Sequence, residues 1–267
     1  MTITTLDGAL AGMRPGAAIA KVTSGTLVAG RPFTPFYLAG APGAAVAPSP
    51  GLGGAALTTY AGQIPVPAAS ANTHLARFSG VASAQGGVLL LCDRLWHNSG
   101  LVVTTTGAQT VTSVAWPARD SAGTTNGDQV LIGLEVSTAT GAGAATPTIS
   151  YTDELGNAGS TGSMSVPYVA TSIAGTFYPF TLAAGDTGVR SVQSCTLGVS
   201  MTSGAIHLVA YRILATLELP AAGIPNAVDV LTSGMPRCYD NTVPFLIYIP
   251  QTTTTTPLSG SVVFTQG

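Results

Sequence analysis

Residues 194–219 decide the fold, and they read SCTLGVSMTSGAIHLVAYRILATLEL. Apolar side chains recur at every second position on both sides of a turn at Thr202-Ser203-Gly204; they are Cys195, Leu197, Val199 and Met201 before it, and Tyr211, Ile213, Ala215, Leu217 and Leu219 after it. Polar side chains such as Arg212, Thr216 and Glu218 fill the alternate positions of the second run. A period of two is typical of a strand with one buried face. The stretch predicts a long antiparallel hairpin, which an aspartate at Leu197 or Ile213 is expected to unfold.

Short β-prone runs separated by turn residues continue on both sides of this hairpin. They lie at 88–92, 101–106, 109–116, 130–136, 148–152, 160–166, 243–249 and 261–264. The runs 148–152 and 160–166 flank the turn-forming residues 153–157, which predicts a second hairpin. One short helix is expected at Pro225 to Leu231, because proline favours a first helical turn and Gly234 follows. Many short strands of this spacing predict an all-β fold, a β-sandwich or jelly-roll-like core over residues 81–267.

Residues 1–80 differ from the rest of the chain. A short helix is expected from Leu6 to Met13, with Thr4 or Thr5 as its cap and Pro15 beyond its end. No charged residue lies between Arg31 and Arg77, and the segment is rich in Pro, Gly and Ala. Because proline disfavours long helices and central strands, we predict an extended N-terminal arm.

The arm carries large apolar side chains that need a surface to lie on. The candidate interaction anchors are Phe33, Phe36, Tyr37, Leu38, Leu52 and Tyr60. Two alternatives stay open, because the arm can wrap its own domain or a neighbouring subunit.

Composition excludes several classes of protein. Charged residues make up only 7% of the 267 residues, against roughly 25% in ordinary soluble proteins. The formal charge of -2 gives no basic excess for binding nucleic acid directly. A mean hydropathy of +0.43 is the reverse of the signature of charged disorder. No apolar run approaches the ~18 residues of a membrane-spanning helix, and no secretory signal is readable, so we expect no membrane partner.

Residues that carry chemistry are sparse. The odd number and wide spacing of Cys92, Cys195 and Cys238 predict buried thiols rather than disulfides or a metal pair. His74, His97 and His207 lack a second ligand at metal spacing. We therefore expect no metal and no cofactor.

Catalytic motifs are also not recognisable. Gly51-Leu52-Gly53-Gly54 is the nearest approach to a phosphate-binding loop, and it lacks the flanking strand and helix. The acidic pairs Asp153-Glu154 and Asp120 with Asp128 could be nominated for glycoside hydrolysis, but both fall in turn-forming sequence. We expect a protein that is not an enzyme.

Some charged residues stand beside apolar runs, namely Asp93-Arg94, Arg119-Asp120, and Asp186 with Arg190. A lone buried charge is costly, so we expect ion pairs or hydrogen bonds to turn amides. Exposed turn charges are the open alternative.

Read as blocks, the chain resembles virion structural proteins of tailed bacteriophages, of the capsid decoration or cement type. The blocks are Gly30 to Phe33 through Pro48 to Gly51, Cys92 to Gly100, Pro117 to Asp120, and Ala184 to Val192. The resemblance implies a capsid or tail component located in the virion and assembled in the host cytoplasm. It transfers no functional residues.

Physical reasoning then selects among virion roles. A shell-forming subunit of the common tailed-phage type needs a long amphipathic helix, and no window has the required 3.6-residue period. A decoration or cement protein needs a β-domain with an arm, so we expect it to bind the major capsid protein or other virion proteins as a homo-oligomer. A tail tube, adaptor or fibre-base component is the first alternative. A carbohydrate-binding module is the second, with Trp96, Trp116 or Tyr239 stacking on sugars.

Overall fold

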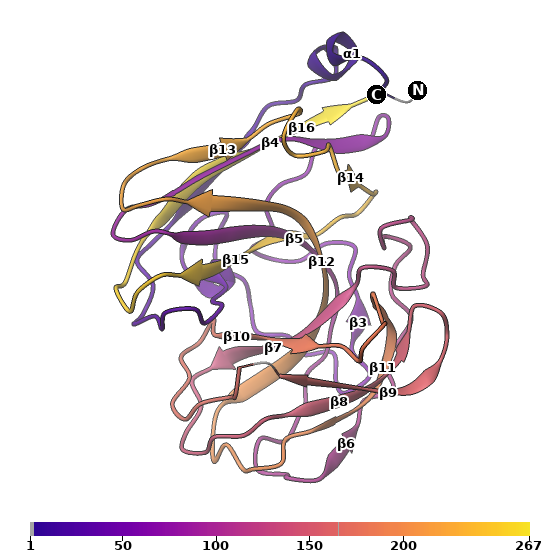
Figure 1. The fold of residues 1–267 in the computed structure, drawn as a ribbon, viewed down its shortest axis with the longest axis vertical. Helices are drawn as coiled ribbons and strands as arrows, with labels where there is room; N and C mark the ends of the chain where they lie inside the picture. Colours follow the sequence, from indigo (N-terminus) through magenta and orange to yellow (C-terminus); the bar gives the residue numbers. More distant parts are fainter. Residues whose placement is uncertain (1–2, 165) are drawn as a thin grey trace. The chain divides into compact units, whose positions relative to one another are not determined.

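The structure is a computed structural model that describes residues 3–164 and 166–267 (Figure 1). It is almost wholly antiparallel β, as expected, with a short helix α1 (Leu6–Ala11) and a 3₁₀ helix η1 (Pro35–Tyr37). The chain forms two compact units. Unit 1 comprises the residues up to Val46, Thr59–Asp93 and Ile213–Gly267, and unit 2 comprises Ala47–Thr58 and Arg94–Arg212.

Unit 1 is a β-sandwich. One layer has the strand order β13-β4-β16-β1-β2, with β14 also on β4; the bounds are β1 (Ala17–Lys21), β2 (Gly40–Ala41), β4 (Thr73–Ala82), β13 (Asn226–Val228), β14 (Arg237–Cys238) and β16 (Leu258–Gln266). The other layer contains β15 (Pro244–Pro250), the first part of β5 (Gly87–His97) and the last part of β12 (Ala205–Leu219). Gly80 of β4 is where the layers approach closely. A Cβ there would lie 3.1 Å from a methyl of Leu89 and 3.2 Å from one of Leu217.

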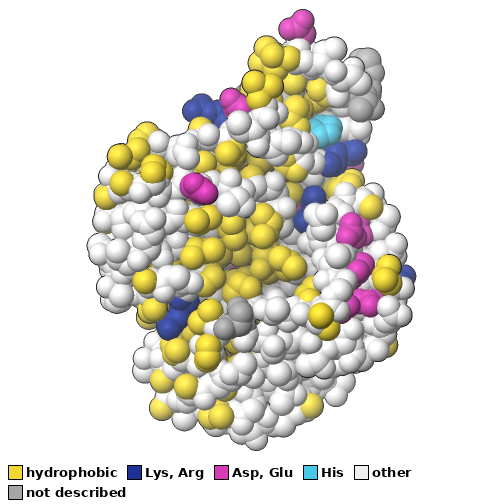
Figure 2. All heavy atoms as spheres, in the orientation of Figure 1, with side chains coloured by type: hydrophobic (Ala, Val, Ile, Leu, Met, Phe, Trp, Pro, Cys, Tyr) yellow, Lys and Arg dark blue, Asp and Glu magenta, His cyan; other side chains and the backbone are white. Residues whose placement is uncertain are grey.

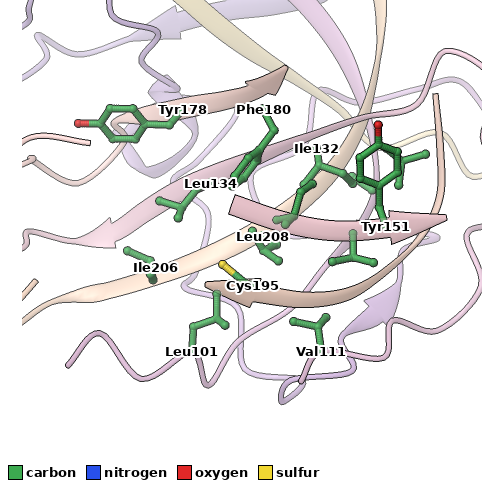
Figure 3. Close-up of a cluster of buried hydrophobic side chains, with 14 of the residues drawn as sticks. Leu101, Val111, Ile132, Leu134, Tyr151, Tyr178, Phe180, Cys195, Ile206 and Leu208 are labelled. Atoms are coloured by element: carbon green, nitrogen blue, oxygen red, sulfur yellow. The ribbon is translucent and has the colours of Figure 1, made fainter. Parts of the chain in front are cut away.

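Unit 2 contains the first part of β12 and the strands that follow it in the order β7-β10-β9-β8-β11-β6. The bounds are β6 (Ala108–Thr110), β7 (Leu131–Thr138), β8 (Thr148–Asp153), β9 (Ala158–Met164), β10 (Phe177–Thr181) and β11 (Val189–Thr196). The short β3 (Ala55–Ala56) pairs with the end of β5. Side chains from β7, β8, β11 and β12, among them Ile132, Tyr151, Cys195 and Leu208, meet in one buried apolar cluster (Figure 3).

Several local predictions are confirmed. Helix α1 begins after Thr5, whose Oγ1 accepts a hydrogen bond from the Gly8 N–H at 3.1 Å. Strands β8 and β9 form the expected hairpin, and β15 and β16 are the expected C-terminal strands. Within residues 3–164 and 166–267, no helix is both long and apolar enough to cross a bilayer.

The predicted long hairpin at 194–219 does not form. Strand β11 ends at Thr196 and pairs with β8 and β6, so that Cys195 lies opposite Ile149 and Gln109. Strand β12 pairs instead with β7, with Leu208 opposite Leu134. Alternation specifies which side chains face a core, but it does not specify the neighbouring strand.

The predicted face of β12 is wrong at two positions. Arg212, expected on the solvent side, is 5% exposed, whereas Ile213, expected in the core, is 39% exposed. Residues 206–212 are buried on both faces of the strand, and a simple alternation in burial begins only at Ala215. A strand covered on both faces has no polar side to reveal its phase.

Three further local predictions, the strands at 101–106 and 109–116 and the helix at 225–231, differ from the structure. Residues 101–106 are turn and irregular backbone, and the run at 109–116 has strand only up to Thr110. Pro225 begins no helix, because Asn226–Val228 pairs with β4 as strand β13.

In the segment predicted to be an extended arm, the backbone between β1 and β4 is mostly irregular apart from η1, β2 and β3. Position 80, the predicted boundary of the arm, falls within β4.

Candidate functional site

Two of the six candidate anchors are buried in unit 1. Phe33 exchanges two backbone hydrogen bonds with Tyr248 of β15, at 2.8 and 2.7 Å, and its side chain is 3% exposed. The Phe36 ring centroid lies 5.7 Å from that of Phe245, also in β15, and 6.1 Å from that of Tyr60. Both phenylalanines therefore pack against their own chain.

The other four anchors keep exposed surface. Tyr37, Leu38 and Tyr60 are half-buried, and the Tyr60 hydroxyl donates to the Val46 carbonyl at 3.1 Å. Leu52 is 38% exposed and belongs to unit 2, whereas the other five anchors belong to unit 1. Two of the six anchors are therefore buried and four keep exposed surface.

Lys21 holds this N-terminal segment in place, a role that the sequence analysis missed. Its Nζ donates to the carbonyl oxygens of Leu38, Pro42 and Gly43 at 3.1, 2.7 and 3.2 Å. The side chain is buried, and desolvation lowers its pKa to about 8. The one signal in the sequence is an isolated cation at the end of an apolar strand.

Unit 2 contains a buried ionic cluster. Arg94 of β5 forms a bidentate ion pair with Glu135 of β7, at 2.8 and 2.7 Å, and neither side chain is exposed. The Arg94 Nε also donates to His97 Nδ1 at 3.2 Å. Desolvation, followed by the charge of Arg94 and by His207, lowers the pKa of His97 to about 2, so its ring is neutral. The guanidinium of Arg119 closes the cluster, donating to the carbonyls of Leu57 and Arg94.

A serine and a histidine meet beside this cluster. Ser137 Oγ lies 2.6 Å from His207 Nε2, and His207 Nδ1 lies 2.9 Å from the Asn98 carbonyl oxygen. Ser137 is half-buried, whereas His207 is 3% exposed. From the sequence, His207 is expected to be a satisfied or partly exposed strand histidine, and nothing marks Ser137, because their contact depends on the unpredicted pairing of β7 with β12.

Asp120 and Asp153, from the acidic pairs that could be nominated for glycoside hydrolysis, accept hydrogen bonds that stabilise turns. Asp120 accepts backbone N–H groups from Ala122, Thr124, Gly127 and Asp128. Burial opposes its ionisation, but hydrogen bonds from Thr124 and these turn amides hold the pKa of Asp120 below its ordinary value. Asp153 likewise accepts from Asn157, at 2.7 Å from the backbone and 2.8 Å from the side chain. The expectation of hydrogen bonds to turn amides is confirmed for Asp120.

Three of the charged residues that stand beside apolar runs, Asp93, Arg94 and Asp186, have partners from elsewhere in the chain. Arg94 pairs with Glu135, while Asp93 accepts the Val243 N–H at 2.9 Å. Asp186 accepts the Tyr151 hydroxyl at 2.5 Å. Among the described residues there is no group of three or more His, Cys, Asp or Glu placed to hold a metal ion.

The two tryptophans have no exposed face for a sugar. Trp96 and Trp116 are 0% and 2% exposed, with ring centroids 5.1 Å apart. Their Nε1 atoms donate to the carbonyls of Gly53 and Val189 at 3.0 and 2.7 Å. The half-buried ring of Tyr239 lies 5.0 Å beneath the Arg237 guanidinium.

The three cysteines are free and buried, as expected. Burial raises the pKa of the Cys195 thiol to about 12 and, together with the charge of Asp93, raises that of Cys92 well above its ordinary value.

Comparison with known proteins gives remote similarities only. No family model and no curated protein matches the chain. One similar solved structure is the VP2 subviral particle of infectious bursal disease virus, with a TM-score of 0.20 and 10% identity over 96% of this chain and 82% of that chain. A second is a structure of the Gt strain of the same virus, with a TM-score of 0.17 and 11% identity over 76% of this chain and 47% of that one.

Proposed function

We propose that this protein is a structural component of a virion, specifically a decoration or cement protein that binds and stabilises a phage head. The observation that carries the proposal is the scarcity of charge on its surface. Eight of the twenty charged side chains are buried, namely Lys21, Asp93, Arg94, Arg119, Asp120, Glu135, Asp153 and Arg212. Twelve remain for the surface of 267 residues. Figure 2 shows few blue or magenta side chains among white and yellow atoms on the face that it draws.

A surface of this kind is suited to burial in an assembly. Ordinary soluble surfaces carry roughly 25–35% charged residues, which keep neighbouring molecules apart. Here large apolar side chains such as Leu231 and Val46 are 79% and 58% exposed. Contacts with copies of the chain or with a larger shell would remove such side chains from water. The block resemblance to tailed-phage virion proteins supports the same role, which requires no catalytic step, cofactor, membrane or direct contact with nucleic acid.

Mass spectrometry of separately purified heads and tails tests the location. We expect the protein in the head fraction, in a constant molar ratio to the major capsid protein. Recovery from the tail fraction alone would support a tail tube, adaptor or fibre-base role instead. Absence from both fractions would overturn the virion proposal.

A matched pair of variants tests the exposed anchor. Leu52→Glu places a charge on the most exposed of the six candidate anchors, and Leu155→Glu places the same charge on the turn between β8 and β9. We expect the Leu52 variant to join heads at reduced occupancy and the Leu155 variant to join them normally. Normal occupancy of both variants would remove Leu52 from the binding surface.

A further inference from the structure

Ser137 occupies an unusual place in the ladder between β7 and β12. Val136 lies opposite Ile206 and Thr138 lies opposite Ala205, so Ser137 is the extra residue of a β-bulge. A bulged residue leaves the regular pairing, and its side chain is directed differently from that of a regular strand residue. In this bulge the redirected hydroxyl meets the ring of His207 at 2.6 Å.

The hydrogen bonds determine the tautomer of His207. A backbone carbonyl only accepts, so the contact of 2.9 Å between Nδ1 and the Asn98 oxygen requires the proton on Nδ1. In the neutral ring Nε2 then carries the lone pair and accepts the Ser137 hydroxyl proton. The alternative acceptor for that hydroxyl, the Ala205 carbonyl, is 3.5 Å away, at the outer limit of a hydrogen bond.

The base is held by a third group, as an activated nucleophile requires. Asn98 and Leu208 are joined by two hydrogen bonds, from Asn98 N–H to the Leu208 carbonyl at 3.1 Å and from Leu208 N–H to Asn98 Oδ1 at 2.7 Å. The Asn98 side chain also donates to the Leu52 carbonyl at 3.2 Å. The carbonyl that orients His207 is therefore fixed by its own side chain and backbone.

The electrostatic surroundings suit a base. Desolvation lowers the pKa of His207, against smaller raising effects from Glu135 and the Asn98 carbonyl, so the ring is uncharged at neutral pH. Glu135 lies directly opposite His207 in the ladder and is fixed by Arg94. Its carboxylate would stabilise the imidazolium that forms when Nε2 takes a proton.

We propose that Ser137 is an activated nucleophile that takes the acyl group of small carboxylic esters, with His207 as its base. Ser137 Oγ forms a bond to the carbonyl carbon, and its proton passes to His207 Nε2. The carbon–oxygen bond to the leaving alcohol then breaks, and the alcohol leaves with that proton. The product is an acyl-Ser137 ester, which water hydrolyses with His207 again accepting and returning the proton. Small esters are the class because Ser137 is half-buried, and a good leaving group compensates for a simple dyad. This chemistry goes beyond the proposed role in assembly.

Covalent labelling of the full chain tests the proposal. A fluorophosphonate probe is applied at pH 7.5, the labelled residue is mapped by peptide mass spectrometry, and p-nitrophenyl acetate is used to follow acyl transfer. We expect one label per chain at Ser137, and a loss of labelling of about 100-fold or more in Ser137→Ala and His207→Gln. Ser79→Ala is the matched control, because Ser79 Oγ meets another hydroxyl, that of Ser261 at 2.9 Å. Its labelling should equal that of the unmodified chain.

A second variant decides the case if His207→Gln does not fold. Ser137→Cys keeps a nucleophile beside His207, and its thiol should react with iodoacetamide in the folded chain faster than an ordinary exposed thiol below pH 7. Absence of label at Ser137 in the folded unmodified chain, or equal labelling of folded His207→Gln, would overturn the proposal. A Ser137→Cys thiol that reacts with iodoacetamide only at a pH above the ordinary pKa of a thiol would also overturn the proposal.

Discussion

The guanidinium of Arg94 and the carboxylate of Glu135 meet through two N–H···O bonds of 2.8 and 2.7 Å where neither side chain has any exposed surface. In the strand order β5-β12-β7, the two residues stand on strands that are not neighbours. Their side chains therefore bridge across β12. Two buried charges are tolerable only because each neutralises the other and the fork geometry satisfies both groups.

Breaking this pair from one side should destabilise the protein strongly. Arg94→Met leaves the Glu135 carboxylate buried without its cation, and we expect a loss of about 3–5 kcal/mol in the free energy of unfolding. Replacing both residues together, as Arg94→Met with Glu135→Leu, should cost less than the two single changes added. Urea denaturation measures all three variants. Arg190→Ala, at an exposed position, is the control and should stay within about 0.5 kcal/mol of the unmodified chain. A single variant as stable as that control would show that the pair contributes nothing.

The same substitution, to aspartate, should destabilise the protein far more at Leu197 than at Ile213. Leu197 has no exposed surface, so Leu197→Asp buries a carboxylate without a partner and should cost more than about 4 kcal/mol or prevent folding. Ile213 is 39% exposed, so Ile213→Asp can place its charge in water and should cost about 1 kcal/mol or less. Thermal unfolding followed by circular dichroism compares them. Equal losses of stability would contradict the assigned burial of β12.

The cysteines should be unreactive in the folded chain. Cys92, Cys195 and Cys238 are all buried, and burial raises the thiol pKa values of Cys92 and Cys195. Because the thiolate is the reactive form, Ellman's reagent at pH 8 should modify no thiol before unfolding and all 3 after denaturant is added. Modification of any of them within minutes in the native protein would place that residue at the surface.

How much of the fold the sequence predicts depends on the range of the interaction. The cap of α1 at Thr5 and the hairpin β8–β9 are set by neighbouring residues, and both are confirmed. The pairing of β12 with β7 joins segments about 70 residues apart, and no local pattern specifies it. The strong alternation at 194–219 predicts a hairpin because the two runs adjoin, whereas each run pairs with another strand.

The Arg94–Glu135 pair and the Ser137–His207 contact could not be predicted either, because each joins residues from strands that are distant in the sequence. Glu135 occupies the polar phase of the run 130–136, which favoured an exposed side chain, but β7 is buried on both faces there. Only the arrival of Arg94 from a distant strand makes that burial tolerable. The contact of Ser137 with His207 depends in addition on a bulge, which shifts the register by one residue at a point that composition does not mark.

Lys21 should make stability depend on alkaline pH. Its pKa is about 8 in the folded chain, because burial disfavours the charged form, and 10.5 is its ordinary value. Between these two pH values the unfolded chain binds more protons than the folded chain, so stability rises with pH in that window. The gain is at most about 1.4 kcal/mol per pH unit, the limit for one proton. Below about pH 8 both states are protonated and the effect disappears.

A matched comparison isolates this effect from the titration of tyrosines. The free energy of unfolding is measured at pH 7, 8.5 and 10 for the unmodified chain and for Lys21→Met, with the exposed Arg77→Met as control. We expect the difference between the unmodified chain and Lys21→Met to move in favour of the unmodified chain as pH rises, and the difference from Arg77→Met to stay constant. Since Lys21 is the sole lysine of the sequence, ¹³C-methylation also gives its pKa directly by NMR. A resonance that titrates at 10.5 in the folded protein would show that burial does not lower the pKa of Lys21, and it would contradict the predicted pH dependence.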